Sequence, residues 1–244
     1  LQERGVLAPY LSPNAADLPS HYRDPDGYWS AFGGRARVFI INTDLLKPGD
    51  YPTSLWDMLD DRYPAQSIGV ARPLFGTTAT QAAALYAKVG AAPALDLFRG
   101  LQQRGVRFVD GNSVVRDMVQ DGQLAFGLTD TDDALVALES GKPVTLVFPD
   151  QAEGDIGTLI IPNSVALVRG GPNPDAGRVL IDYLLSAESE RRLVEIGWCQ
   201  VTLRPVGARS ALDLDHLRSM DVSYAEILSN LAQAVEDLRP IFVN

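Results

Sequence analysis

Short apolar runs alternate with amphipathic segments through the middle of the chain. The runs at 35–41, 67–71, 106–109, 124–128 and 144–148 are rich in β-branched and aromatic residues, which is typical of strands. After the second of these runs, apolar residues recur at helical spacing between one run and the next. Strands that alternate with helices in this way predict an α/β fold with a largely parallel sheet.

The two ends of the chain follow a different pattern. Residues 9–34 are punctuated by proline and glycine and predict irregular structure. Two further strands are expected at 158–161 and 165–168, on either side of Pro162. Residues 224–238 carry apolar side chains on one face of a predicted helix, so this helix is expected to pack on one side only.

Composition and charge exclude several classes of protein to which this chain could belong. The 244 residues are 46% hydrophobic and 21% charged, which supplies a core and argues against a disordered chain. The formal net charge of −10 provides no field that attracts a phosphate backbone, so nucleic acid is not an expected partner. No apolar run has the length of a membrane span. The single cysteine, Cys199, excludes an intrachain disulfide and a cysteine-rich metal site.

Polar residues gather at three junctions where a predicted strand leads into a predicted helix. In an open parallel sheet these junctions share one edge, where ligands bind and where helix N-termini attract anions. The hydroxyls and amide of the first two junctions suit an oxyanion, whereas the carboxylates of the third suit a cation or an amine. The candidate ligand-binding residues are Thr77, Thr78, Asn112, Ser113, Asp130, Thr131, Asp132 and Asp133.

The same residues also have a purely structural interpretation. Serine, threonine, asparagine and aspartate are the usual N-caps of helices, and a cap needs no ligand. Asp132 and Asp133 would complement the dipole of the helix that they begin. The pattern leaves both interpretations open at this point. No Gly-x-Ser-x-Gly elbow, P-loop or histidine-based triad occurs in the sequence, so no enzyme class is indicated.

Several short segments follow one another in a recognisable order. They are DGYW at 26–29, PTSLWDML at 52–59, PLFGTT at 73–78, GQLAFGL at 122–128 and GTLIIP at 157–162. This order resembles the ferric-iron-type periplasmic solute-binding proteins of ABC transporters, which are type II periplasmic binding proteins. The resemblance covers nearly the whole chain. It implies two α/β lobes that are joined by a two-strand hinge and that trap a solute by closing.

The resemblance also implies how the chain is divided between the lobes. Lobe 1 is expected to comprise residues 1–42 and 163–244, and lobe 2 residues 43–162. The chain begins at Leu1, whereas the family builds part of lobe 1 from a preceding strand–helix unit. Lobe 1 is therefore expected to lack its N-terminal part.

The function that the resemblance implies is transport. The protein would be the extracytoplasmic, periplasmic substrate-binding subunit of an ABC importer, a monomer that delivers a small solute to an ABC permease in the inner membrane, and not an enzyme. Thr77, Thr78 and Asn112 match the positions at which the family contacts a partner anion. Iron-binding members place adjacent tyrosines after the strand that matches 124–128, where this chain has carboxylates.

Carboxylates are also hard oxygen donors that can hold a metal. The expected solutes are therefore Fe³⁺ or another metal bound through Asp132 and Asp133 with a synergistic anion, a small oxyanion, or an organic solute. No cofactor is otherwise expected. Two alternatives remain: a sensing protein of the same fold that presents its ligand to a membrane receptor, and an enzyme acting on a phosphorylated substrate. The enzyme would need a general base, and only Asp130, Asp132 or Asp133 could serve.

Overall fold

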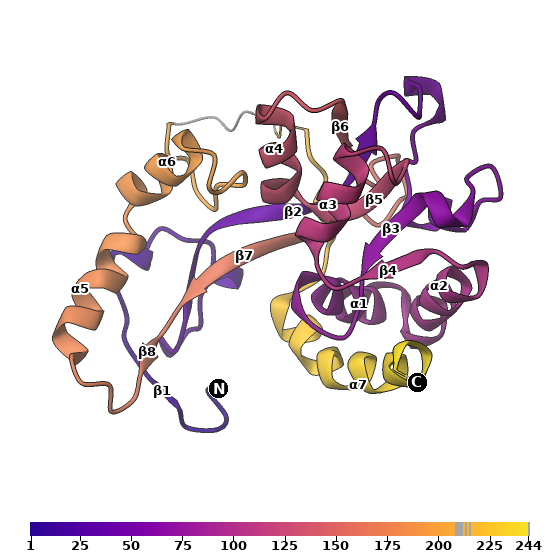
Figure 1. Ribbon diagram of the computed structural model, residues 1–244. Helices are drawn as coiled ribbons and strands as arrows, with labels where there is room; N and C mark the ends of the chain where they lie inside the picture. The colour runs from indigo at the N-terminus through magenta and orange to yellow at the C-terminus, as the bar shows by residue number, and fades with distance from the viewer. Residues whose placement is uncertain (208–211, 213, 215, 244) are drawn as a thin grey trace. The chain divides into compact units, whose positions relative to one another are not determined.

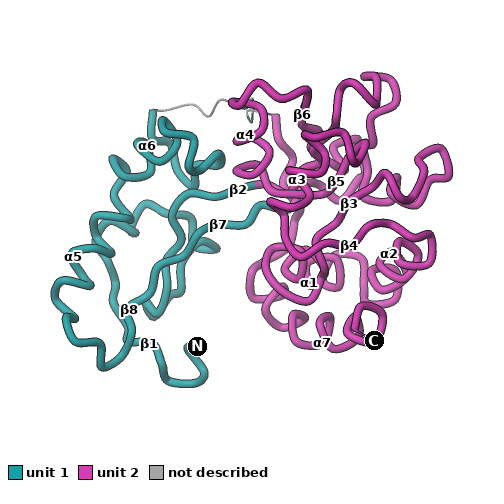
Figure 2. Tube along the Cα trace, in the orientation of Figure 1, with its two compact units in different colours: residues 1–35, 160–215 teal, residues 36–159, 216–244 magenta. Residues whose placement is uncertain are grey.

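A computed structural model describes residues 1–207, 212, 214 and 216–243, which form two units. Unit 1 comprises residues 1–35 and 160–215, and unit 2 comprises residues 36–159 and 216–244 (Figure 2). The chain passes from unit 1 to unit 2 within strand β2 (Ser30–Asn42) and returns immediately before strand β7 (Ile160–Val165). Among the described residues, none of the helices combines the length and the apolar character that a membrane span requires.

A sheet in the order β4-β3-β5-β2-β6 forms the centre of unit 2 (Figure 1). Strands β3 (Ile68–Ala71), β4 (Arg107–Val109) and β5 (Phe126–Asp130) are parallel. Strand β2 runs antiparallel to both β5 and β6 (Val144–Val147). The predicted alternation of strands and helices is confirmed. The sheet is mixed because β2 runs against its neighbours β5 and β6, whereas β3, β4 and β5 run in one direction.

The helices of unit 2 follow the strands as the hydrophobic pattern predicts. They are α1 (Gly76–Val89), α2 (Ala91–Arg104), α3 (Asn112–Gln120) and α4 (Thr131–Glu139), and the short 3-10 helix Leu55–Leu59 precedes β3. Helix α3 lies on β3 and β5, close to two glycines that pair in the sheet. A Cβ atom on Gly127 would lie 2.3 Å from Val115 Cγ1, so glycine is what allows this close approach.

The C-terminal helix α7 (Tyr224–Phe242) packs on α1 and α2 (Figure 1). Its buried residues Ile227, Ala234 and Leu238 form the predicted apolar stripe, and the rings of Phe108 and Phe242 lie 4.5 Å apart. The prediction that residues 163–244 all belong to lobe 1 is therefore wrong for this helix. Its stripe predicts one-sided packing but does not say which helices cover it.

Unit 1 is built around a small core between its N-terminal segment and two helices. Strands β1 (Leu7–Ala8) and β8 (Leu167–Val168) pair antiparallel, and helices α5 (Pro174–Leu184) and α6 (Ala187–Glu195) follow. The core residues include Leu18, Phe32 and Leu185.

One strand of this region differs from its prediction. Strand β7 continues through Pro162, whereas we predicted two strands separated at this proline. The proline is tolerated because β7 pairs with β2 alone among the described strands, so the lost N–H group is not needed by a second neighbour.

Candidate functional site

Strand β2 contributes one arginine to the interior of unit 2. Arg37 lies in a strand whose residues Ala36, Val38 and Phe39 are fully buried, and its own side chain is 0% exposed. A guanidinium remains charged in proteins, so its burial calls for a carboxylate partner. The partner is Asp130, which is opposite Arg37 in the β2–β5 ladder. The distance from Arg37 Nη1 to Asp130 Oδ1 is 2.6 Å.

The first residues of α1 and α3 complete the surroundings of Asp130. Thr77 Oγ1 and Asn112 Nδ2 each donate to Asp130 Oδ2 at 2.8 Å. Arg37 Nη1 lies 3.0 Å from Thr77 Oγ1, and Arg37 Nη2 lies 3.3 Å from Thr78 Oγ1. Four of the candidate residues, Thr77, Thr78, Asn112 and Asp130, are thus brought together at one edge of the sheet. They are held by a buried ion pair and its hydrogen bonds.

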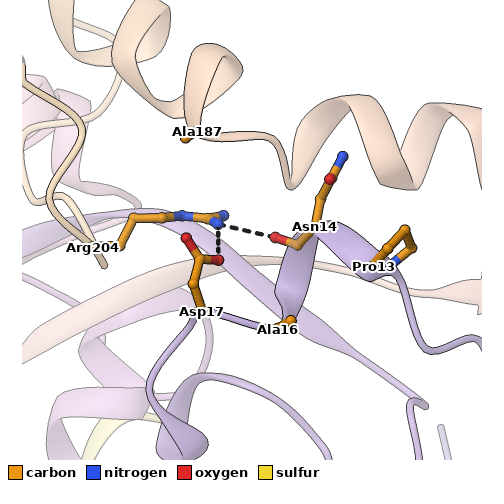
Figure 3. Close-up of a pocket in the computed structure, with 6 residues that line it drawn as sticks. All are labelled: Pro13, Asn14, Ala16, Asp17, Ala187 and Arg204. Atoms are coloured by element: carbon orange, nitrogen blue, oxygen red, sulfur yellow. Dashed lines mark hydrogen bonds and ion pairs between the residues drawn. The ribbon is translucent and has the colours of Figure 1, made fainter.

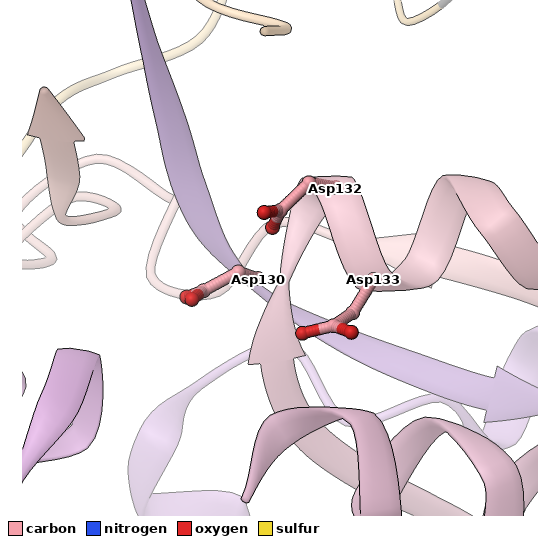
Figure 4. Close-up of side chains that lie close together, drawn as sticks. All are labelled: Asp130, Asp132 and Asp133. Carbon is pink, nitrogen blue, oxygen red and sulfur yellow. The ribbon is translucent and has the colours of Figure 1, made fainter. Parts of the chain in front are cut away.

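Asp132 and Asp133 continue this edge on the first turn of α4 (Figure 4). Carboxylate oxygens of these two residues and of Asp130 all lie within 4.8 Å of one another. Asp133 also pairs with Arg116 of α3, at 3.3 Å between Oδ1 and Nη1. Burial, and next the charge of Asp132, raise the pKa of the Asp133 carboxyl to about 6, although Arg116 acts in the opposite direction.

The raised pKa of Asp133 predicts that unit 2 loses stability as the pH rises from about 4 to about 6. The folded protein holds the Asp133 proton more tightly than the unfolded chain, so the contribution is present at low pH and is lost through the folded pKa. Partial solvent access reduces the expected loss to about 1 kcal/mol. Urea denaturation of the wild type and of Asp133→Asn across this range measures it.

The free-energy difference between the two proteins should change from about pH 4 through the folded pKa of about 6 and level off about one pH unit above it. Asp132→Asn should shift the change towards lower pH, because it removes the negative neighbour that raises the pKa of Asp133. A difference between wild type and Asp133→Asn that is constant from pH 4 to pH 7 would contradict this assignment.

The remaining candidate residues, Ser113 and Thr131, have different positions. Ser113 is exposed on the first turn of α3. Thr131 is buried, and its Oγ1 accepts a hydrogen bond from the backbone N–H of Ala36 at 3.1 Å, which ties α4 to β2. We predicted a turn over 129–133, but the β2–β5 ladder continues to Asp130 and α4 begins at Thr131. The pairing with β2 lengthens the strand beyond its apolar run.

Two arginines of this edge were missed by the sequence interpretation. Arg37 carries a signal in the sequence, since it is a charge with apolar neighbours on both sides inside a predicted strand. Such a charge calls for a buried carboxylate. The sequence does not say which carboxylate, because Asp130 lies 93 positions away. Arg116 has no comparable signal, since a charged residue on a predicted amphipathic helix is usually solvated.

A hollow in unit 1 has a different chemical character (Figure 3). Arg204 Nη1 bonds Asn14 O at 2.9 Å and the Asp17 carboxylate, Nε bonds Glu190 at 2.9 Å, and Nη2 bonds Leu185 O at 2.5 Å. Each guanidinium nitrogen is engaged by the protein, so this arginine has a structural role. The hollow is lined by Pro13, Asn14, Ala16, Asp17, Ala187 and Arg204.

Comparison with known proteins identifies related sequences over most of the chain. A family model described as bacterial extracellular solute-binding protein matches residues 1–214. A putative 2-aminoethylphosphonate-binding periplasmic protein of Salmonella typhi is 26% identical over 200 residues, which cover 80% of this chain and 58% of the relative. Iron uptake protein A2 of Synechocystis is 26% identical over 208 residues, with the same two shares. The chain therefore spans a little over half the length of these curated relatives.

Solved structures confirm the predicted fold. Iron-bound HitA from Pseudomonas aeruginosa superposes with a TM-score of 0.86 at 21% identity, covering 100% of this chain and 78% of that one. At this level of identity the likeness shows the fold alone. The fold is the α/β fold of type II periplasmic binding proteins, as the order of the short sequence segments predicted.

Proposed function

Because the chain belongs to the bacterial extracellular solute-binding proteins, we propose that it is a substrate-binding subunit of an ABC importer. It acts outside the cytoplasmic membrane, binds one small solute and delivers it to an ABC permease. Its relatives are named for the solutes they bind or take up, a phosphonate in one case and iron in another. A protein with this role binds its solute and does not convert it.

The observation that carries the proposal is the edge of unit 2 at which β2, β5 and three helix N-termini meet. At this edge the buried ion pair of Arg37 and Asp130 lies beneath the half-buried carboxylates of Asp132 and Asp133. Arg37 is buried and pairs with Asp130, and the buried Thr78 accepts a hydrogen bond from Arg37, whereas Asp132 and Asp133 are half-buried and Ser113 is exposed. We assign the solute contacts to Asp132, Asp133 and Ser113, and the support of those contacts to the residues beneath them. A rigid sheet edge with accessible polar groups is a usual place for a ligand in an α/β fold.

Ferric iron fits this edge in part as a cargo. Asp132 and Asp133 supply two hard oxygen ligands of the kind that a trivalent metal prefers. Asp130 fits less well, because Arg37 donates to one of its carboxylate oxygens while Thr77 and Asn112 donate to the other. Iron would therefore need further ligands from a chelating anion or from elsewhere in the protein. A ferric complex matches the site better than the bare ion.

A panel of solutes tests the proposal. The wild-type protein is screened by thermal shift and native mass spectrometry with ferric citrate, divalent metals, 2-aminoethylphosphonate, phosphate and simple amines. A true solute raises the melting temperature by mass action, by an amount equivalent to about 2.7 kcal/mol at a hundred times its dissociation constant. The Asp132→Ala and Asp133→Ala variants should weaken its binding at least about tenfold, which corresponds to about 1.4 kcal/mol.

The matched control is Asp121→Ala, which removes an exposed carboxylate at the end of α3 whose partner is Lys142. This variant should bind the solute as the wild type does. If no solute of any class shifts the melting temperature, the assignment to an importer fails. If a solute binds but the Asp132 and Asp133 variants bind it equally well, the solute contacts lie elsewhere.

A further inference from the structure

We propose that Asp130 is a built-in anion: its carboxylate fills the donor set that would otherwise bind an oxyanion. The edge of unit 2 therefore rejects phosphate, phosphonate and sulfate and selects a solute with positive charge. The second statement rests on the function proposed above, whereas the first concerns the chemistry of unit 2 alone. Asp130 and Arg37 are both buried, and neither has to contact the solute of the wild type.

The donors around Asp130 are those that proteins use to hold a bound anion. A guanidinium, a hydroxyl and a primary amide converge on one carboxylate from β2, α1 and α3, at 2.6 to 2.8 Å. Charge-assisted hydrogen bonds of this kind are short and strong, and they recognise carboxylate and phosphate alike. The N-termini of α1 and α3 add the positive ends of their dipoles. In this chain the anion at the centre is covalently part of the protein.

The guanidinium offers more donors than Asp130 accepts. Arg37 places only Nη1 on the carboxylate, and its Nε atom is buried with no hydrogen-bond partner among the described residues. A carboxylate that pairs through a single oxygen leaves the fork of the guanidinium partly unused. A tetrahedral oxyanion has four acceptor oxygens and could engage more of this fork. Arg37 Nη2 now donates to Thr78 Oγ1 at 3.3 Å, so an anion in place of the Asp130 carboxylate could draw on both Nη1 and Nη2 together with Thr77 and Asn112.

The charges around this position explain why the wild type should not bind such an anion. Asp130, Asp132 and Asp133 place carboxylate oxygens within 4.8 Å of one another, and Arg37 and Arg116 pair with Asp130 and Asp133. A phosphate at this edge would meet three negative groups, in surroundings where partial burial strengthens repulsion between like charges. A solute with a cationic group would instead reduce that repulsion. Electrostatic complementarity therefore favours a metal complex or an amine.

Removal of the Asp130 side chain should open the oxyanion site. In Asp130→Ala the guanidinium, hydroxyl and amide remain in place, with a vacant position between them and one negative charge fewer. We expect phosphate and formate to raise the melting temperature of this variant in a saturable manner. By isothermal calorimetry phosphate should bind it at least about a hundredfold more tightly than the wild type, a difference of about 2.7 kcal/mol. Wild type should show no saturable shift with either anion.

The matched control is Asp150→Ala. Asp150 is also a buried carboxylate in unit 2, but its oxygens accept from Ser54 Oγ at 2.6 Å and from the backbone N–H of Leu55. The carboxylate of Asp150 accepts from a hydroxyl and a backbone N–H and not from a guanidinium, since Arg218 donates to the backbone carbonyl of this residue. Anions should therefore not stabilise this variant. Equal stabilisation of the Asp130 and Asp150 variants by phosphate would show a general salt effect and would overturn the proposal.

Asp130→Ser keeps the experiment decisive if the alanine variant does not fold in any buffer. Its hydroxyl leaves a polar group beside the buried donors, whereas the shorter side chain still vacates the carboxylate position and removes the charge. A folded Asp130→Ser protein that binds phosphate no better than wild type would refute the built-in anion, as would tight phosphate binding by wild type. A different result would contradict the proposed function alone. In that case no solute of the panel would bind the wild type, whereas phosphate would still bind the Asp130 variants.

Discussion

Arg37→Met is expected to lower the free energy of unfolding of unit 2 by about 3–5 kcal/mol, because it leaves a buried carboxylate without its compensating charge. Arg37 is 0% exposed and Asp130 is 3% exposed in the side chain, so water cannot replace the lost guanidinium. Thr77 and Asn112 would still donate to Asp130, but neutral donors do not balance its charge. Urea denaturation followed by circular dichroism measures the change.

The control for this variant is Arg99→Met. Arg99 pairs with Asp96 on the surface of α2, and its side chain is 46% exposed, so the pair contributes about 0–1 kcal/mol. A double variant, Arg37→Met with Asp130→Leu, removes both buried charges and should regain most of the stability that Arg37→Met loses. If the double variant is as unstable as the sum of the two single variants, the loss does not come from the unpaired charge.

Local patterns in the sequence predicted most of the elements that form the edge of unit 2. The turns at Thr77 and Asn112 each follow a short apolar run, and both residues lie where such a turn passes into a helix. Because parallel strands end at the same edge of a sheet, the convergence of these residues could be expected. This inference needs only short-range information, which explains why it succeeds.

The partner of these residues could not be predicted in the same way. We expected Thr77, Thr78 and Asn112 to contact a bound anion, and the structure places an anion there that belongs to the chain itself. Asp130 was predicted to lie in a turn and to face a cation. Its actual position depends on the register between β2 and β5, which pairs Arg37 with Asp130. Register is a long-range property that no local pattern carries.

The packing of the C-terminal helix also depends on long-range partners that local sequence patterns do not predict. The apolar stripe of α7 was predicted, but the faces that cover it lie on α1 and α2, well over a hundred residues earlier in the chain. An amphipathic stripe states that a helix is covered on one side and leaves the identity of the cover open. The family resemblance did not predict where α7 packs either, because it assigned residues 163–244 to lobe 1.

The built-in anion changes what the relatives imply for the solute of this protein. One relative is named for 2-aminoethylphosphonate, which carries a cationic ammonium group and an anionic phosphonate group, and another is named for iron. If Asp130 is a built-in anion, the edge would not offer the donors around Asp130 to a phosphonate group. On this proposal the edge would contact a solute through its cationic part, which is a metal in one case and an ammonium group in the other.

Glu190→Ala is expected to destabilise unit 1 by about 3–5 kcal/mol, since Glu190 is the fully buried partner of Arg204. Its carboxylate accepts from Arg204 Nε at 2.9 Å and from the backbone N–H of Leu203 at 2.6 Å. Arg204 in turn bonds the carbonyls of Asn14 and Leu185, so one guanidinium connects three segments of the unit. Thermal and urea denaturation of the variant measure the loss.

The control is Glu188→Ala, two residues earlier on α6, where the exposed carboxylate pairs with Arg191 and Arg192. This substitution should leave the melting temperature close to that of wild type, because a surface ion pair is screened by water and salt. Since Glu190 and Arg37 belong to different units, their variants should move different parts of the unfolding curve if the units unfold separately. If Glu188→Ala and Glu190→Ala destabilise the protein equally, the buried ion pair is not what stabilises unit 1.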